Sequence, residues 1–177
     1  MDRRQFIRAV ATAAPVLALP GFASAAGVAV GPRVLTFAHL HTAEKLEVEY
    51  MDGVRYLPQA LSAVNHLLRD FRTGDVHDID PALLDLLHAL HAETGSRRPF
   101  EIISGYRSPI TNAMLRSHGG GVAAGSLHME GKAIDIRLAD VPLVKLRQAA
   151  LEAGRGGVGF YPASDFVHVD TGRVRRW

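Results

Sequence analysis

The sequence predicts a single α+β domain, with a mostly antiparallel central sheet and helices packed on it, over residues 26–177. Three observations favour this class. A chain of 177 residues suits one domain with its own core. Its 47% apolar and 21% charged residues are an ordinary globular balance. Helical patterns come mainly before the later strand patterns, with some interleaving, which argues against a doubly wound parallel sheet.

Residues 1–25 have the organisation of an export signal. Arg3, Arg4 and Arg8 precede a short apolar run at 9–19, and the small residues 23–25 form a cleavage site. The run is too short to span a bilayer and contains prolines, so we expect no membrane span in the mature chain. The order Arg-Arg-x-Phe-Ile resembles a twin-arginine signal, which implies export machinery as a partner. An ordinary secretory signal is the alternative, and both predict a periplasmic protein.

Charge and cysteine content exclude several classes of function. Removal of residues 1–25 would leave equal numbers of basic and acidic side chains, so the sequence pI of about 9.2 describes the precursor. No basic patch is interleaved with aromatic residues, which excludes nucleic acid as the expected partner. The chain has no cysteine, so disulfides and thiolate metal sites are excluded. Any metal must be held by His, Asp or Glu.

The first half of the mature chain alternates between strand and helix signals. Apolar runs separated by turn-prone residues predict strands at 34–39 and 46–51. Apolar residues at helical spacing predict a helix at 57–71. A second helix should begin at Asp80-Pro81, with Asp as the N-cap and Pro in the first turn, and should stop at Gly95.

The second half contains more strands than helices. The same patterns predict, in order, a buried strand at 100–104, a short helix at 110–117, a glycine-rich loop at 119–121, a strand at 133–138, a helix at 141–153, and strands at 158–161 and 166–170.

The segment 126–136 carries the first candidate metal ligands. His128 and Asp135 stand seven residues apart, with Gly131 between them. On a continuous helix they would share one face, but Gly131 and the alternation after it indicate a loop that leads into a strand. An ionised Asp135 between two isoleucines is costly to bury unless it is paired or bound to a metal.

The segment 166–170 supplies a third candidate ligand. On a strand, His168 and Asp170 share the face opposite Val167 and Val169. Two histidines and one carboxylate are a standard catalytic zinc set, with a fourth position left for water. Calcium and magnesium prefer all-oxygen shells, so the pattern predicts one Zn²⁺ ion.

These residues resemble a known family. Ser-x-His-x-x-Gly-x-Ala-x-Asp followed by a late His is similar to the zinc D-Ala-D-Ala metallopeptidase superfamily, which includes lysostaphin-like peptidases and hedgehog domains. The similarity extends to 104–109, to 156–162 and to the Phe-Val-His-Val-Asp segment. Together these motifs most resemble the periplasmic murein endopeptidases that cut peptide cross-links.

The resemblance implies roles for individual residues. His128, Asp135 and His168 would be the zinc ligands, and Arg107 would stabilise the polarised carbonyl oxygen; pairing with a surface carboxylate is the alternative for Arg107. Proton transfer falls to Asp170 or Asp165, with Asp170 favoured as the base or as the partner that orients His168.

Relatives often carry Glu or a second His shortly before the last ligand. Asp165 occupies the position three before it, where an odd offset on a strand would turn its side chain away from the metal. Ser126 and Tyr106 are expected to contact substrate, with capping of the loop as the alternative for Ser126.

The implied function is zinc-dependent hydrolysis of peptidoglycan peptide cross-links, with the L,D-type bond between two diaminopimelate residues favoured. Peptide stems and cross-links would be the binding partners. Two alternatives remain open at this point. One is a D-Ala-D-Ala carboxypeptidase, which trims the stem terminus. The other is a non-catalytic wall-binding module that keeps its metal for stability.

Overall fold

The structure is a computed structural model that describes residues 31–119 and 123–177. The export signal predicted at 1–25 lies outside the described residues, as do two of the three residues of the predicted glycine-rich loop at 119–121. Within the described part, no helix combines the length and the apolar character that crossing a bilayer requires.

The described strands form one mixed sheet in the order β3-β2-β1-β4-β5-β7-β6-β8. The strands are β1 (Arg33–His39), β2 (Lys45–Asp52), β3 (Arg55–Tyr56), β4 (Phe100–Ser104), β5 (Ala133–Leu138), β6 (Gly157–Tyr161), β7 (Phe166–Asp170) and β8 (Arg175–Arg176). The pairs β1/β4 and β6/β8 are parallel, and the other neighbours are antiparallel. This arrangement confirms the predicted α+β class.

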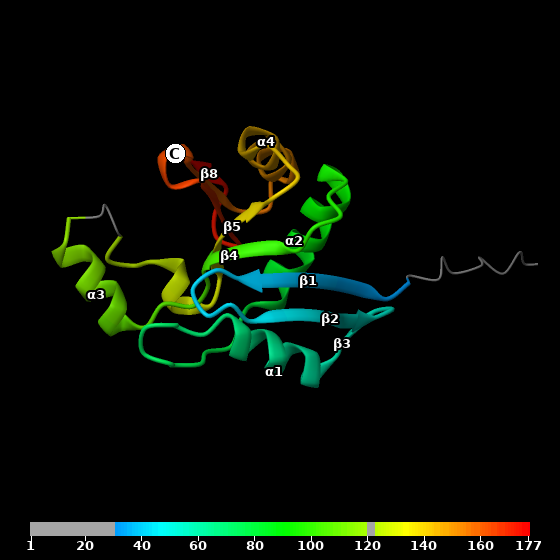
Figure 1. The fold of residues 1–177 in the computed structure, drawn as a ribbon, viewed down its shortest axis with the longest axis horizontal. Helices are drawn as coiled ribbons and strands as arrows, with labels where there is room; N and C mark the ends of the chain where they lie inside the picture. Colours follow the sequence, from blue (N-terminus) through cyan, green and yellow to red (C-terminus); the bar gives the residue numbers. More distant parts are fainter. Residues whose placement is uncertain (1–30, 120–122) are drawn as a thin grey trace, which may run out of the picture.

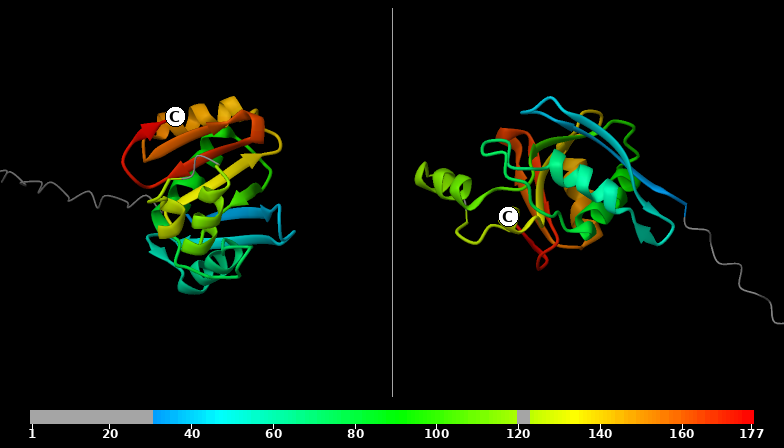
Figure 2. Two further views of the ribbon diagram at one scale, coloured as in Figure 1. Left: turned by 90° about the vertical axis from the view of Figure 1, so that its left-hand side faces the viewer. Right: turned by 90° about the horizontal axis from the view of Figure 1, so that it is seen from below.

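Three of the four described helices pack against the sheet and form the hydrophobic core with it. The helices are α1 (Pro58–Leu67), α2 (Pro81–Thr94), α3 (Pro109–Ser117) and α4 (Leu143–Ala153). Helix α1 contacts β2, α2 contacts β1, and α4 contacts β5, β6 and β7. By contrast, α3 projects away from the body of the domain (Figures 1 and 2). Its buried side chains are the polar Thr111 and Asn112.

Strand alternation places the candidate site on the sheet face opposite α4. Val167 and Val169 of β7 belong to the hydrophobic core. His168 and Asp170 therefore point to the other face, because successive side chains of a strand alternate. The isoleucines that flank Asp135 on β5 are core residues in the same way, so Asp135 shares the face of His168.

Most predicted elements are confirmed, with two kinds of error. The helix predicted at 57–71 ends at Leu67. Leu68 and Phe71 continue the apolar spacing although they lie beyond the helix, because Leu68 is buried in the core and Phe71 stacks on His41 of the turn between β1 and β2. The two-residue strands β3 and β8 were not predicted, since pairs such as Arg175–Arg176 carry no strand signal.

Candidate metal centre

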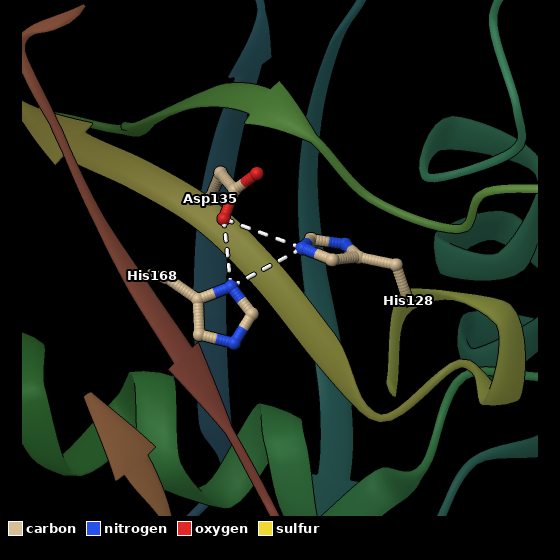
Figure 3. A group of neighbouring side chains, drawn as sticks. All are labelled: His128, Asp135 and His168. Atoms are coloured by element: carbon tan, nitrogen blue, oxygen red, sulfur yellow. Dashed lines mark hydrogen bonds and ion pairs between the residues drawn. The ribbon is translucent and has the colours of Figure 1, made fainter. Parts of the chain in front are cut away.

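Three side chains from separate segments converge on the face of the sheet opposite α4. His128, Asp135 and His168 bring one nitrogen or oxygen atom each to within 4.8 Å of one another, and all three residues are buried. Figure 3 shows the three side chains pointing toward a common centre. The sequence-predicted ligand set is therefore assembled by the fold.

Strand register and a short helical turn produce this convergence. Asp135 on β5 and His168 on β7 are directly opposite each other in the antiparallel ladder, where paired side chains are close neighbours. His128 lies in the 3₁₀ turn Leu127–Glu130 that immediately precedes β5. The loop-to-strand arrangement predicted for this segment is confirmed.

Gly131 is required at the junction between the turn and β5 for two reasons. Its φ of 66° lies in the left-handed region that side chains disfavour. A Cβ at this position would also overlap the carbonyl oxygen of Asp78. Only glycine lets the chain turn here from His128 toward Asp135.

Hydrogen bonds fix which nitrogen of each imidazole faces the centre. His128 Nδ1 lies 2.7 Å from the carbonyl oxygen of Gly105, and His168 Nε2 lies 3.1 Å from Asp170 Oδ2. Both partners are acceptors, so each of these nitrogens can donate a hydrogen to its partner in the neutral ring. The other two nitrogens, His128 Nε2 and His168 Nδ1, face Asp135 Oδ1. In the tautomers that donate to Gly105 and Asp170 these nitrogens present lone pairs, as metal-ligating histidines do.

The distances within the cluster fit a small cation. His128 Nε2 is 3.3 Å from Asp135 Oδ1, His168 Nδ1 is 2.9 Å from the same oxygen, and the two nitrogens are 3.2 Å apart. Ligand atoms around a tetrahedral ion with bonds of 2.0–2.1 Å lie about 3.3 Å from one another. Three acceptor atoms that face one another need a positive charge between them, so the residues present fit a metal ion.

The pKa values of Asp135 and His168 are shifted by the attraction between these groups. Burial alone would raise the pKa of Asp135, but attraction and hydrogen bonds from His128 and His168 hold it well below the ordinary range. Burial alone would lower the pKa of His168, but its hydrogen bonds to Asp135 and Asp170 raise it above the usual value. A proton on His168 thus occupies the place that a metal cation would take.

Asp170 lies behind His168, on the side away from the other ligands. Its carboxylate is fully buried and accepts hydrogen bonds from the backbone N–H groups of Gly157 (2.8 Å) and Gly172 (2.9 Å). Arg175 adds a two-point ion pair, with Nη2 2.7 Å from Oδ2. Burial opposes these bonds, yet together they hold the pKa of Asp170 far below its usual range. This environment suits a carboxylate that orients the His168 ring and opposes its use as a proton acceptor.

Arg107 lies on the other side of the cluster. Its Nη2 is 3.9 Å from Asp135 Oδ2, and its side chain is 12% exposed. Its backbone N–H donates to the carbonyl of His128 at 3.1 Å. Burial lowers the pKa of Arg107 from its usual value, although Asp135 opposes this shift; a guanidinium remains charged under these conditions.

A cavity of about 340 Å³ opens beside the three candidate ligands. Arg107 and Ser126 line it together with an aromatic wall of Tyr161, Phe166 and Trp177. The rings of Tyr161 and Phe166 stack with centroids 4.6 Å apart, and Trp177 Nε1 donates to Tyr161 Oη at 2.7 Å.

Sequence reasoning assigned no role to the aromatic wall or to Arg175. The available signal was their place inside or just after the segments that resemble the murein endopeptidases. The motifs mark those segments, but a motif does not specify which of its side chains face a cavity.

Two predicted site residues are placed elsewhere. Asp165 follows the 3₁₀ turn Pro162–Ser164 with φ of 54°, is 63% exposed in its side chain, and pairs with Arg137 at 2.7 Å. It does not join the cluster, which agrees with the expectation that its offset turns it away. Tyr106 stacks on His77, with ring centroids 4.7 Å apart, and is not among the described residues that line the cavity.

Comparison with known proteins identifies relatives over nearly the whole chain. The family model described as "Peptidoglycan L,D-endopeptidase MepK" (Peptidase_M15_2) matches residues 27–177. The Peptidoglycan L,D-endopeptidase MepK of Escherichia coli strain K12 is 44% identical over 168 residues, which are 95% of this chain and 91% of that protein. The Probable peptidoglycan L,D-endopeptidase MepK of Haemophilus influenzae is 46% identical over 147 residues, covering 82% of this chain and 79% of that one.

A solved structure shows a more distant similarity. The crystal structure of the L-Ala D-Glu endopeptidase ChiX of Serratia marcescens aligns with 22% identity and a TM-score of 0.34, over 54% of this chain and 71% of ChiX. This similarity is too remote to bear on function.

Proposed function

The chain belongs to the MepK family of peptidoglycan L,D-endopeptidases, and from this premise we propose that it is an exported zinc enzyme that hydrolyses the L,D-type cross-link between two diaminopimelate residues. The observation that carries the proposal is the cluster of three inward-facing acceptor atoms beside a cavity. Family membership supplies the substrate class, and the cluster supplies the means of hydrolysis.

Zinc is proposed as the metal on the chemistry of the donor atoms. Two imidazole nitrogens and one carboxylate oxygen suit zinc better than calcium or magnesium, which prefer oxygen ligands. Three protein ligands leave one position for a small molecule, as in other catalytic zinc sites. A bound zinc ion supplies Lewis acidity, which polarises a peptide carbonyl and makes water more acidic.

Arg107 is assigned to the carbonyl oxygen of the bond that is cut. Its guanidinium lines the cavity close to Asp135 and is largely buried. A fixed positive charge in a site with little water stabilises the negative charge that develops on this oxygen in the transition state. Its fork of N–H donors also orients the peptide group.

Asp170 is assigned to positioning His168. Its oxygens already accept from two backbone N–H groups and from Arg175, in addition to His168. A carboxylate with this many donors holds a proton poorly, so it keeps His168 in the tautomer that presents Nδ1 to the metal.

Ser126 and Tyr161 are assigned to substrate contact. Both carry hydroxyl groups and line the cavity. The peptide stems of peptidoglycan offer amide and carboxylate groups that such hydroxyls bind. Residues 1–25 are proposed to act as the export signal, which would bring the domain to its substrate in the periplasm.

The proposal is tested with purified protein and muropeptide dimers that contain either an L,D or a D,D cross-link. We expect zinc-dependent conversion of the L,D-linked dimer to monomers, followed by mass spectrometry, and loss of this activity in His168→Ala. His66→Ala is the matched control, because His66 is exposed on α1 away from the cluster, and should turn over at the wild-type rate.

Three outcomes would overturn parts of this assignment. Intact dimers after incubation with zinc would rule out the endopeptidase. Undiminished cleavage by His168→Ala would separate the activity from the cluster. Release of free D-Ala without loss of dimer would indicate a carboxypeptidase instead.

A further inference from the structure

The segment that connects α1 to α2 contacts two loops of the candidate metal centre, one that carries Arg107 and one that carries His128. At its start, the carbonyl of Leu68 accepts the N–H of Tyr106 at 2.7 Å. Near its end, the N–H of Asp80 donates to the carbonyl of Gly131 at 3.0 Å. This segment shows only the signs of a helix end in the sequence, with cationic residues and Gly74. The structure places it against the residues on either side of Arg107 and against the loop of His128.

Three consecutive backbone N–H groups hold the loop that carries Arg107. Tyr106 donates to the carbonyl of Leu68, Arg107 donates to the carbonyl of His128 at 3.1 Å, and Ser108 donates to Asp70 Oδ2 at 2.9 Å. The first two acceptors are backbone atoms. Asp70 is the side chain among the three, so it is the anchor that a substitution can remove without changing the course of the chain.

The carboxylate of Asp70 is buried and hydrogen-bonded at this position. It is 1% exposed, and its Oδ1 accepts the N–H of Arg72 at 3.0 Å while Oδ2 accepts that of Ser108. Ser108 is also the N-cap of α3, where its hydroxyl accepts the N–H of Thr111. Burial alone would raise the pKa of Asp70, but hydrogen bonds from Thr111, Ser108 and Arg72 outweigh it and lower the pKa. The carboxylate therefore stays ionised and holds both N–H groups.

The side chain of Arg107 has little else to fix its direction. Its Nε is buried without a hydrogen-bond partner among the described residues, and its nearest ion pair, to Asp135, spans 3.9 Å. A long side chain held at its end by one long ion pair depends for its direction on the backbone that carries it. The position of the guanidinium thus depends on the three anchors of residues 106–108.

We propose that Asp70 is a positioning residue that holds Arg107 in line with the scissile carbonyl group. This inference rests on the proposed function, because it assumes that Arg107 stabilises charge developed in the reaction. Asp70 touches no substrate. Its loss lets the 106–108 loop shift, and small misplacements of a charge-stabilising group lower turnover more than binding.

The variant Asp70→Asn tests this role with the smallest change in shape. An amide offers one acceptor oxygen, so its NH₂ group must face either Ser108 N–H or Arg72 N–H, and one of them loses its partner. We expect kcat on the L,D-linked dimer to fall about 10–100-fold, with KM and zinc content unchanged. Asp85→Asn is the control, because Asp85 also accepts several hydrogen bonds but lies on α2 in a separate cluster with Arg33, Tyr50 and Tyr56; its kcat should match that of the wild type.

A double-mutant cycle with Arg107→Lys distinguishes positioning from general loss of structure. If Asp70 acts through Arg107, Asp70→Asn should have little further effect on kcat in the Arg107→Lys background, where the guanidinium fork is absent. An equal loss of kcat in both backgrounds would overturn the proposal. So would loss of zinc in Asp70→Asn, because the effect would then pass through the metal site. If Asp70→Asn does not fold, Asp70→Ser, which keeps one acceptor oxygen, enters the same cycle.

A second measurement does not need activity. In ¹⁵N spectra, the Nε resonance of Arg107 and the exchange protection of the Ser108 amide should change in Asp70→Asn and stay unchanged in Asp85→Asn. An unchanged Arg107 resonance would contradict the inference even if the wild-type protein cleaved no cross-link. An inactive wild type with a shifted Arg107 resonance would contradict only the proposed function.

Discussion

Two polar clusters on this sheet show how differently buried charge can be arranged. In the Asp85 cluster, one carboxylate accepts from Arg33 Nη1 at 2.7 Å, from Tyr50 Oη at 2.9 Å and from Tyr56 Oη at 2.6 Å. In the cluster of His128, Asp135 and His168, a carboxylate oxygen and two imidazole lone pairs face one another. Both include side chains of β-strands, yet the first supplies donors for its acceptor and the second supplies acceptors alone.

The donors of the Asp85 cluster keep their protons throughout the physiological range. Burial, together with Asp85, raises the pKa of Tyr56 to about 12 and raises that of the more deeply buried Tyr50 as well. The cluster needs nothing from solution, which is typical of a structural network. The cluster of His128, Asp135 and His168 lacks such donors, and a bound cation would balance its acceptors. The balance of donors and acceptors therefore separates a structural site from a binding site.

The strongest test makes the same substitution in both clusters. Asp135→Asn should lose the metal and lower kcat/KM at least about 10³-fold, because several kcal/mol of transition-state stabilisation depend on the metal. Asp85→Asn should lower the free energy of unfolding by about 1–3 kcal/mol, because donors lose a charged acceptor, and leave kcat/KM unchanged. Kinetics, metal analysis and urea denaturation measure these effects. A metal-loaded, active Asp135→Asn would remove the distinction between the clusters.

A smaller effect is expected at Asp170, which contacts the candidate ligand His168 and would not bind the metal itself. Asp170→Asn should weaken metal affinity or activity about 10–100-fold, because the amide no longer fixes the His168 tautomer as a carboxylate does. Competition with a chelator and steady-state kinetics measure the two quantities. Asp165→Asn is the control, since Asp165 is exposed and pairs with Arg137. Equal losses in both variants would show that Asp170 has no special relation to His168.

Metal affinity should depend on pH, whereas the hydrogen bonds of the Asp85 cluster should not change across the physiological range. The pKa of His168 is raised, so a proton competes with the metal below that pKa and is released when the metal binds. Affinity should rise with pH by up to about tenfold per unit from about pH 5, and level off above the raised pKa.

The same pKa shift sets the stability of the metal-free protein. The stability that comes from protonated His168 is fully present below its unfolded pKa and is lost as pH rises through the folded pKa. Metal titrations and thermal unfolding across this range measure both trends. Affinity that is independent of pH would show that no proton shares the site.

The smallest expected effect lies at the edge of the Asp85 cluster. Tyr56→Phe removes one of the three donors at a partly exposed position. The free energy of unfolding should fall by about 1 kcal/mol, with metal content and kcat unchanged, as denaturant unfolding and kinetics would show. A loss of activity in this variant would indicate that the two clusters are coupled through the sheet.

The residues of the candidate metal centre could be predicted because their signals are local. Gly131 and the alternation that begins at Ala133 place Asp135 on a strand, and the alternation around His168 places it on another. Their direct pairing between β5 and β7 depends on strand order, which local patterns do not contain. The convergence of the three side chains was therefore a prediction from resemblance, and the register explains it.

The proposed contribution of Asp70 could not be predicted because it depends on contacts distant in sequence. Asp70 and Ser108 are 38 positions apart, and Asp70 stands in a segment with the composition of a helix end. The same long-range packing misled the prediction of α1, where Leu68 is a core residue that lies beyond the last turn. Apolar spacing records burial, and a loop that is buried produces the same spacing as a helix.

The position of Trp177 gives the protein a built-in optical reporter. It is the single tryptophan of the chain, and its ring centroid lies 5.2 Å from that of His168. Indole emission is quenched by a protonated imidazole nearby and changes again when the imidazole binds a metal. Intrinsic fluorescence can therefore follow occupancy of the site in solution, without a label.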